Sequence, residues 1–114
     1  MIKGIGTDIV DIERVRKAMS ESFLSKVLSE EEIEKASSMK EERKVQFVAG
    51  RFAAKEAIIK ALSDEEVPVM NELNIVNDAK GKPQIEYKDY QILISISHEK
   101  TYAVAFAILE QLER

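Results

Sequence analysis

Hydrophobic and polar positions alternate most clearly in the second half of the chain. Over residues 91–98 isoleucine recurs at every second position, and over 101–109 large apolar residues alternate with alanines. This period of two predicts two strands joined by a hairpin turn at 98–101, with an alanine face on which a helix could pack closely. The other segments in which β-branched residues predict a strand are 2–10, 85–87 and, weakly, 67–76.

A period of 3.6 residues indicates the helices. The longest such segment runs from about residue 42 to 62, with no proline and one glycine. Before it, Asp11 can cap a short helix, a second helical stretch covers 23–28, and Ser29 with Glu32 forms a capping box that opens another helix. Because helices precede most of the strands, we expect an α+β fold with a long central helix packed on a mostly antiparallel sheet.

Length, charge and residue content narrow the class of protein. The 114 residues fit one domain, 1–114, and a hydrophobic content of 45% excludes a disordered chain. The net charge of −4 argues against nucleic-acid binding, and the absence of cysteine excludes disulfide scaffolds, zinc knuckles and thiol catalysis. The N-terminus does not read as a signal peptide, and no apolar run approaches the ~20 residues of a membrane span. We therefore expect a soluble, cytoplasmic protein with no membrane contact.

Glu56 lies in the middle of an apolar stripe on the long helix. The residues within about 60° of it on a helical wheel are Val45, Ala49, Phe52, Ala53, Ile59 and Lys60. A buried carboxylate must be paired or bound to a metal ion, because an unpaired buried charge is very costly. Two interpretations remain, a Glu56–Lys60 pair on a partly exposed helix or a metal ligand or base. Phe47 and Ile58 make the opposite face apolar as well, which weakly supports a subunit interface.

Asp8 is a second carboxylate in an unusual place, inside the first predicted strand. Aspartate is depleted in strands, so it either faces water at a sheet edge or serves as a ligand for a hard cation. Two carboxylates together with substrate phosphates and water are a common way to hold magnesium. The sequence does not place Asp8 beside Glu56.

Three further features are candidates for binding. His98, the only histidine, follows a strand, where it is either structural or solvated or takes part in binding or catalysis. The segment Lys80–Pro83 predicts a turn that could present two ammonium groups to a phosphate, although it is not a P-loop. Arg14, Arg16 and Lys17 form a basic patch on the first helix, either a solvated face or a surface that attracts an acidic partner.

Taken together, four segments resemble the holo-[acyl-carrier-protein] synthase family of 4′-phosphopantetheinyl transferases. They are GIGTDIVDIERV at 4–15, RFAAKEAIIKAL at 51–62, GKP at 81–83 and ISISHEKTYAVAFAIL at 94–109. Each segment alone is weak, but all four occur in the family's order and run nearly from end to end. The resemblance implies the 4′-phosphopantetheinyl transferase fold and an enzyme that moves 4′-phosphopantetheine from coenzyme A to a serine hydroxyl of apo-acyl carrier protein. Adenosine 3′,5′-bisphosphate would leave, and the product would support fatty acid biosynthesis and lipid metabolism.

The resemblance also implies roles for individual residues. Asp8 and Glu56 would hold Mg²⁺ on the pyrophosphate and, with Lys60, form the catalytic group, and Glu56 is the favoured base for the serine, directly or through a water. The residues implied to bind coenzyme A are Arg51, Lys55, Lys60, Gly81, Lys82, Pro83, Ser97 and His98. Arg14, with Arg16 and Lys17, would meet the acidic carrier protein. The family forms homotrimers with active sites between neighbouring subunits.

One segment departs from the family pattern. Where family members usually have a glycine-rich loop after the helix motif, this chain has Ser63–Pro68, with no glycine and three acidic residues. If the missing loop helps to hold coenzyme A, affinity or substrate choice would differ. Two alternatives to the transferase therefore stay open, a non-catalytic module that binds acyl carrier protein and a structural oligomer with a buried Glu56–Lys60 pair.

Overall fold

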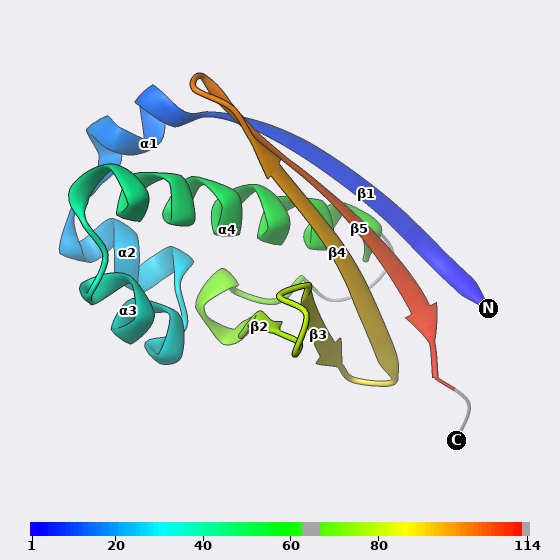
Figure 1. The fold of residues 1–114 in the computed structure, drawn as a ribbon. Helices are drawn as coiled ribbons and strands as arrows, with labels where there is room; N and C mark the ends of the chain where they lie inside the picture. The colour runs from blue at the N-terminus through cyan, green and yellow to red at the C-terminus, as the bar shows by residue number, and fades with distance from the viewer. Residues whose placement is uncertain (63–66, 113–114) are drawn as a thin grey trace.

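The α+β prediction is confirmed by a computed structural model that describes residues 1–62 and 67–112 (Figure 1). This part of the chain forms four α-helices, one 3₁₀ turn and a five-stranded antiparallel sheet of order β1-β5-β4-β3-β2. The helices are α1 (Ile12–Ala18), α2 (Glu21–Val27), α3 (Glu30–Ser37) and α4 (Glu41–Ala61). The strands are β1 (Ile2–Asp11), β2 (Val76–Asn77), β3 (Pro83–Tyr87), β4 (Tyr90–His98) and β5 (Tyr102–Gln111).

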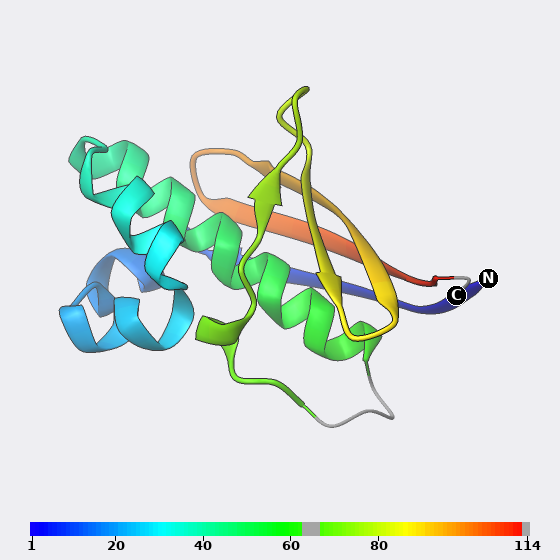
Figure 2. The same ribbon diagram turned by 90° about the horizontal axis from the view of Figure 1, so that it is seen from below.

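The helices lie on one side of the sheet. The long helix α4 lies against the sheet, next to β1 and β5, and α1, α2 and α3 gather around one end of it (Figures 1 and 2). No helix of the described residues covers the opposite face of the sheet (Figure 1). None of these helices is long and apolar enough to cross a lipid bilayer.

Small residues allow α4 to approach the sheet closely. The alanine face of β5 points toward the helix and is fully buried, as the alternation predicts. On β1, a Cβ atom added to Gly6 would stand 1.9 Å from the carbonyl oxygen of Ala57, and one added to Gly4 would stand 2.1 Å from that of Ala61. The backbone of β1 therefore lies directly on the backbone of α4. Asp8, two residues after Gly6, points to the same side of the strand.

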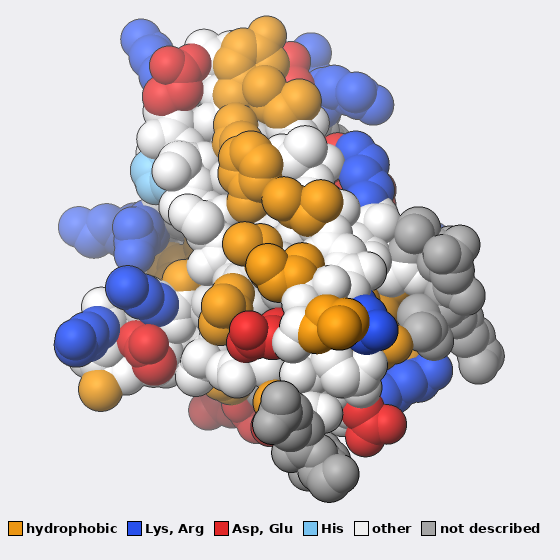
Figure 3. Space-filling model, turned by 90° about the vertical axis from the view of Figure 1, so that its right-hand side faces the viewer, with side chains coloured by type: hydrophobic (Ala, Val, Ile, Leu, Met, Phe, Trp, Pro, Cys, Tyr) orange, Lys and Arg blue, Asp and Glu red, His pale blue; other side chains and the backbone are white. Residues whose placement is uncertain are grey.

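The helix α4 is buried on several sides, but within this chain. Ile58 is fully buried in the core, and Phe47 packs against the core while remaining partly exposed. The prediction that this face of the helix supports a subunit interface is therefore wrong for Ile58, because α4 is enclosed between the sheet and the other helices. Several exposed apolar residues, among them Ile5, Ile9 and Phe106, lie instead on the outer face of the sheet, where apolar side chains form a band (Figure 3).

The predicted starts of the short helices are confirmed. Asp11 accepts a hydrogen bond from the backbone N–H of Glu13 at 2.9 Å and caps α1. Ser29 and Glu32 form a complete capping box at the start of α3. Since these caps satisfy backbone N–H groups that have no partner inside the helix, they fix where each helix begins.

The weak strand expected over 67–76 is wrong for most of its length. A 3₁₀ turn occupies Met70–Glu72, and only Val76–Asn77 pairs with β3. Leu73 and Ile75 are buried in the core although they belong to no strand, so they produce an alternating pattern without a ladder partner. The departure at Ser63–Pro68 falls mainly on residues 63–66, which lie outside the described part of the chain.

Candidate active site

Asp8 and Glu56 line the same pocket, which has a volume of about 380 Å³. Asp8 comes from β1, with a side chain 18% exposed, and Glu56 comes from the facing side of α4 and is half-buried. The close packing of β1 on α4 thus brings together the two carboxylates that the sequence could not place. Among the described residues no group of three or more His, Cys, Asp or Glu could surround an ion. The carboxylate oxygens fit a hard cation such as Mg²⁺ whose other ligands come from a bound phosphate and water.

Lys60 provides a positive charge beside Asp8. Its ammonium group donates hydrogen bonds to the Asp8 carboxylate and to the backbone oxygen of Thr7, both at 3.0 Å. Among the described residues its ion pair is therefore formed with Asp8 rather than with Glu56, so the alternative of a Glu56–Lys60 pair is wrong. The side chain of Lys60 is 55% exposed, so an anionic ligand in the pocket can reach it.

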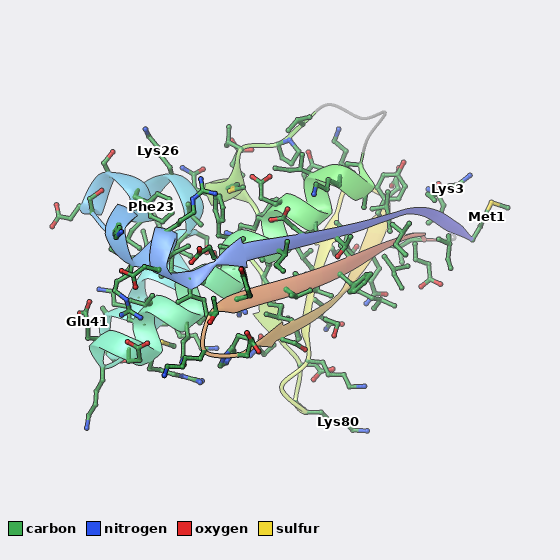
Figure 4. The ribbon with its side chains drawn as sticks, turned by 90° about the horizontal axis from the view of Figure 1, so that it is seen from above. Met1, Lys3, Phe23, Lys26, Glu41 and Lys80 are labelled. Carbon is green, nitrogen blue, oxygen red and sulfur yellow. The ribbon has the colours of Figure 1, made fainter. Side chains whose placement is uncertain are left out.

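The remaining wall of this pocket is largely apolar. Val15 of α1, Phe23 of α2 and Phe52 of α4 contribute to it, and the two rings lie 6.0 Å apart. Figure 4 shows Phe23 within the helical end of the molecule, where α1 and α2 meet. The pocket therefore joins a carboxylate end to an apolar end.

The three basic residues of α1, Arg14, Arg16 and Lys17, do not share one environment. Arg14 lines the carboxylate pocket, and Lys17 is exposed to solvent. Arg16 instead donates two hydrogen bonds to Glu42, at 2.7 and 2.8 Å, and one to Glu13 at 3.0 Å. The hydrogen bond to Glu42, and then that to Glu13, raises the pKa of Arg16. The guanidinium of Arg16 thus already links α1 to α4, and its contact with a partner stays a prediction.

A second pocket, of about 210 Å³, collects four residues expected to bind the nucleotide. Arg51 of α4, Gly81 and Pro83 of the β2–β3 hairpin, and His98 at the end of β4 all line it. Gly81 has φ +86°, a backbone conformation that favours glycine at this turn. The predicted GKP turn is therefore confirmed.

Two further cations line this pocket that no sequence pattern indicated, Lys35 of α3 and Arg43 of α4. Both lie on helix faces that read as ordinary solvated surface, and only the folding of α3 beside α4 brings them near Arg51. With Arg51 they make this a cationic pocket that suits an anionic ligand.

Four of the residues expected to bind coenzyme A do not line this second pocket, and one of them, Lys60, lies beside Asp8 instead. Lys82 lines a neighbouring hollow on the hairpin, and Lys80 stands at the hairpin tip, away from the sheet (Figure 4). Ser97 is exposed and lies on the opposite face of β4 from Ile96 and His98, because successive strand residues alternate. Lys82 and Ser97 therefore lie outside this pocket within one chain, and their contact with coenzyme A stays a prediction.

Lys55 is fully buried, so the prediction that it binds coenzyme A is wrong. Its ammonium group donates to the backbone oxygens of Val27 at 2.7 Å and Met70 at 3.0 Å, and to the carboxylate of Glu32. Desolvation lowers the pKa of Lys55, while the hydrogen bond and charge of Glu32 oppose that change. Lys55 therefore ties α4 to the end of α2, the start of α3 and the 3₁₀ turn.

Glu32 is shared between Lys55 and Arg51. Its second oxygen accepts the backbone N–H of Ile75 at 3.2 Å and lies 3.4 Å from Arg51 Nε. Desolvation lowers the pKa of Arg51, against the raising effect of Glu32. The guanidinium also donates to Asn77 at 3.1 Å and lies 4.7 Å from the ring centre of Phe47. This buried cluster connects the second pocket to the core.

The sequence comparisons agree on one family. Residues 4–107 match the family model described as the 4′-phosphopantetheinyl transferase superfamily. The chain belongs to this superfamily. A holo-[acyl-carrier-protein] synthase from Geobacillus sp. (strain WCH70) is 43% identical over 98% of this chain and 99% of that protein. One from Bacillus cereus is 42% identical over the full length of both.

Solved structures of 4′-phosphopantetheinyl transferase superfamily members have the same fold. The holo-(acyl-carrier-protein) synthase from Bacillus anthracis, in complex with CoA (3′,5′-ADP), matches with a TM-score of 0.87 and 38% identity over 97% of this chain and 98% of that one. The Helicobacter pylori holo-[acyl-carrier-protein] synthase in complex with coenzyme A matches with a TM-score of 0.79 and 29% identity over 93% of this chain and 99% of that one. The 4′-phosphopantetheinyl transferase fold expected from the sequence is therefore confirmed.

Proposed function

We propose that the protein is a holo-[acyl-carrier-protein] synthase. It transfers 4′-phosphopantetheine from coenzyme A to a serine hydroxyl of apo-acyl carrier protein and releases adenosine 3′,5′-bisphosphate. The observation that carries this proposal is the pocket shared by Asp8 and Glu56, in a chain that aligns from end to end with holo-[acyl-carrier-protein] synthases. The product would serve fatty acid biosynthesis, and the reaction would take place in the cytoplasm.

The chemistry requires positioning and charge neutralisation more than covalent catalysis. The serine oxygen forms a bond to the phosphorus that carries pantetheine, the bond from that phosphorus to the bridging oxygen breaks, and the serine proton leaves. Mg²⁺ held by Asp8 and Glu56 would supply positive charge to the pyrophosphate. Lys60, which is exposed beside Asp8, would donate hydrogen bonds to the same phosphates. Glu56 is the proposed acceptor of the serine proton, directly or through a water.

The nucleotide end of coenzyme A fits the second pocket. Arg51, Lys35 and Arg43 give it cationic donors for phosphate, His98 adds an imidazole, and the backbone at Gly81 approaches it without a side chain. The relatives solved with coenzyme A or 3′,5′-ADP support an adenosine nucleotide as the ligand.

The acyl carrier protein would bind at the helical end of the carboxylate pocket. Arg14 lines this pocket, and Lys17 is exposed on the same helix. Cations there would attract an acidic partner, and the apolar wall around Phe23 and Phe52 would bury its apolar side chains. The serine would then lie next to Asp8 and Glu56.

We further propose a homotrimer with active sites between subunits. The two pockets share no residue, yet one molecule of coenzyme A must reach both. A neighbouring subunit that places its second pocket against the first would solve this. The outer face of the sheet supports oligomerisation, because Ile5, Ile9 and Phe106 expose 65%, 61% and 49% of their surface there (Figure 3).

Intact-mass spectrometry of an apo-acyl carrier protein tests the activity. After incubation with the protein, coenzyme A and magnesium, we expect a mass gain of one phosphopantetheine group that EDTA abolishes. Asp8→Asn and Glu56→Gln should reduce turnover by at least about 100-fold while retaining the fold, whereas the exposed Glu72→Gln serves as a control of equal charge change. No gain with several carrier proteins, from a folded protein that still binds them, would instead indicate a non-catalytic binding module.

Mixing inactive variants tests the shared site. Asp8→Asn and Arg51→Gln would each be inactive alone, but mixed trimers would contain some sites with neither change. Recovery of activity after mixing supports a site built from two chains, and native mass spectrometry should give three times the chain mass. A monomer that is fully active would contradict this part of the proposal.

A further inference from the structure

We infer that Glu32 and Asn77 are positioning residues that hold the Arg51 guanidinium ready for the nucleotide of coenzyme A. This inference rests on the proposed function, because it assigns the second pocket to that nucleotide. Neither residue belongs to the four motif segments, and neither needs to touch the substrate for this role.

The three contacts of Arg51 come from different directions. Glu32 lies 3.4 Å from Nε, Asn77 accepts from Nη2 at 3.1 Å, and the ring of Phe47 lies 4.7 Å from the central carbon. Among the described residues, no protein acceptor contacts Nη1. The Nη2 edge and one face of the guanidinium are therefore held by direct contacts, and the buried Nε faces the charge of Glu32 without a hydrogen bond. The N–H groups of Nη1 are left for a ligand.

Glu32 is itself held rigidly. Its side chain is 3% exposed, and its two oxygens accept from Lys55, from the backbone N–H of Ser29 and from the backbone N–H of Ile75. A carboxylate with this many donors cannot follow Arg51 if that side chain moves. It therefore acts as a fixed point for the guanidinium rather than as a mobile counterion.

A fixed arginine binds a ligand better than a free one. Immobilising a side chain with many rotamers costs free energy, and a protein that has already ordered the side chain avoids that cost on binding. Glu32 also has an opposing effect, because its negative charge weakens the attraction of Arg51 for an anion. A test must therefore alter the geometry without removing the charge.

Two substitutions meet this requirement. Glu32→Asp keeps the charge but withdraws the carboxylate from Arg51 by one methylene group. Asn77→Ala removes the second contact at an exposed position of β2, so the variant should fold even if Glu32→Asp does not. Glu34→Asp, at an exposed position of the same helix as Glu32, is the matched control.

Isothermal titration with adenosine 3′,5′-bisphosphate measures the effect. We expect Glu32→Asp and Asn77→Ala each to weaken binding of the nucleotide about 3- to 10-fold, and Glu34→Asp to leave it unchanged. In an Arg51→Gln background, Glu32→Asp and Asn77→Ala should have no further effect on binding. Unchanged affinity in the folded variants, or an equal loss in the Arg51→Gln background, would overturn the inference while leaving the proposed function intact. If the wild-type protein binds no nucleotide, both the proposed function and this inference fail.

Discussion

Replacing Lys55 with methionine should destabilise the protein strongly, although the side chain lies outside both pockets. Methionine fills a similar space but removes the ammonium group that neutralises the Glu32 carboxylate, which keeps only the backbone N–H groups of Ser29 and Ile75 as hydrogen-bond donors. It also leaves the backbone oxygens of Val27 and Met70 without the ammonium that now reaches them. Removing one partner of a buried ion pair costs about 3–5 kcal/mol. A chain of 114 residues has a free energy of unfolding of roughly 6–17 kcal/mol, so the loss is a large fraction of the total.

Urea unfolding followed by circular dichroism at one protein concentration measures this loss. The same change at the exposed Lys26 should shift the free energy of unfolding by less than about 0.5 kcal/mol, since surface substitutions rarely do more. Lys55→Met should also lower the melting temperature by roughly 12–20 °C. A Lys55→Met variant within about 1 kcal/mol of wild type would refute the assignment of Lys55 to a structural role.

Three other outcomes can be checked. Gly6→Ala should lower the free energy of unfolding by at least about 3 kcal/mol in a urea titration, since the added Cβ would overlap the α4 backbone. Gly81→Ala should lower it by only about 1 kcal/mol, from the positive φ alone. Equal losses would contradict the argument that β1 packs directly on α4. Phe106→Glu should reduce the mass measured by light scattering toward that of one chain, and an unchanged mass would exclude the outer sheet face as the interface. Burial lowers the pKa of Lys55 below 10.5, so just below that pH the unfolded state binds more protons than the folded state. The stability difference between wild type and Lys55→Met should therefore widen as the pH rises toward 10.5, and a narrowing would contradict this direction.

Local patterns predicted the elements well because their causes are local. The alternation over 91–98 and 101–109 gave β4 and β5, and Asp11 and Ser29 gave the helix starts. The failure at 67–76 has the opposite cause. Leu73 and Ile75 are buried in the core although they belong to no strand, and such burial imitates a strand pattern when only the sequence is available.

The candidate site was predictable to a similar extent. The position of Glu56 in an apolar stripe pointed to a special carboxylate, but its pairing with Asp8 depends on how β1 lies on α4. Glu32 was identified only as half of a capping box, because its other partners, Lys55 and Arg51, lie 23 and 19 residues away. Lys55 was misassigned for a related reason: a lysine in a motif segment can stabilise the fold through buried contacts instead of binding the substrate.

The pairing of β1 with β5 also determines when the protein can fold. The two strands lie at opposite ends of the sequence, with Asp11 opposite Tyr102 and Ile2 opposite Glu110. During synthesis α4 is complete long before β5 is made, so one apolar side of the helix has no sheet to cover it until the last strand emerges. We therefore expect the chain to fold cooperatively only after β5 has been synthesised, so that the pairing of β5 with β1 is the step that commits a new chain to the native state.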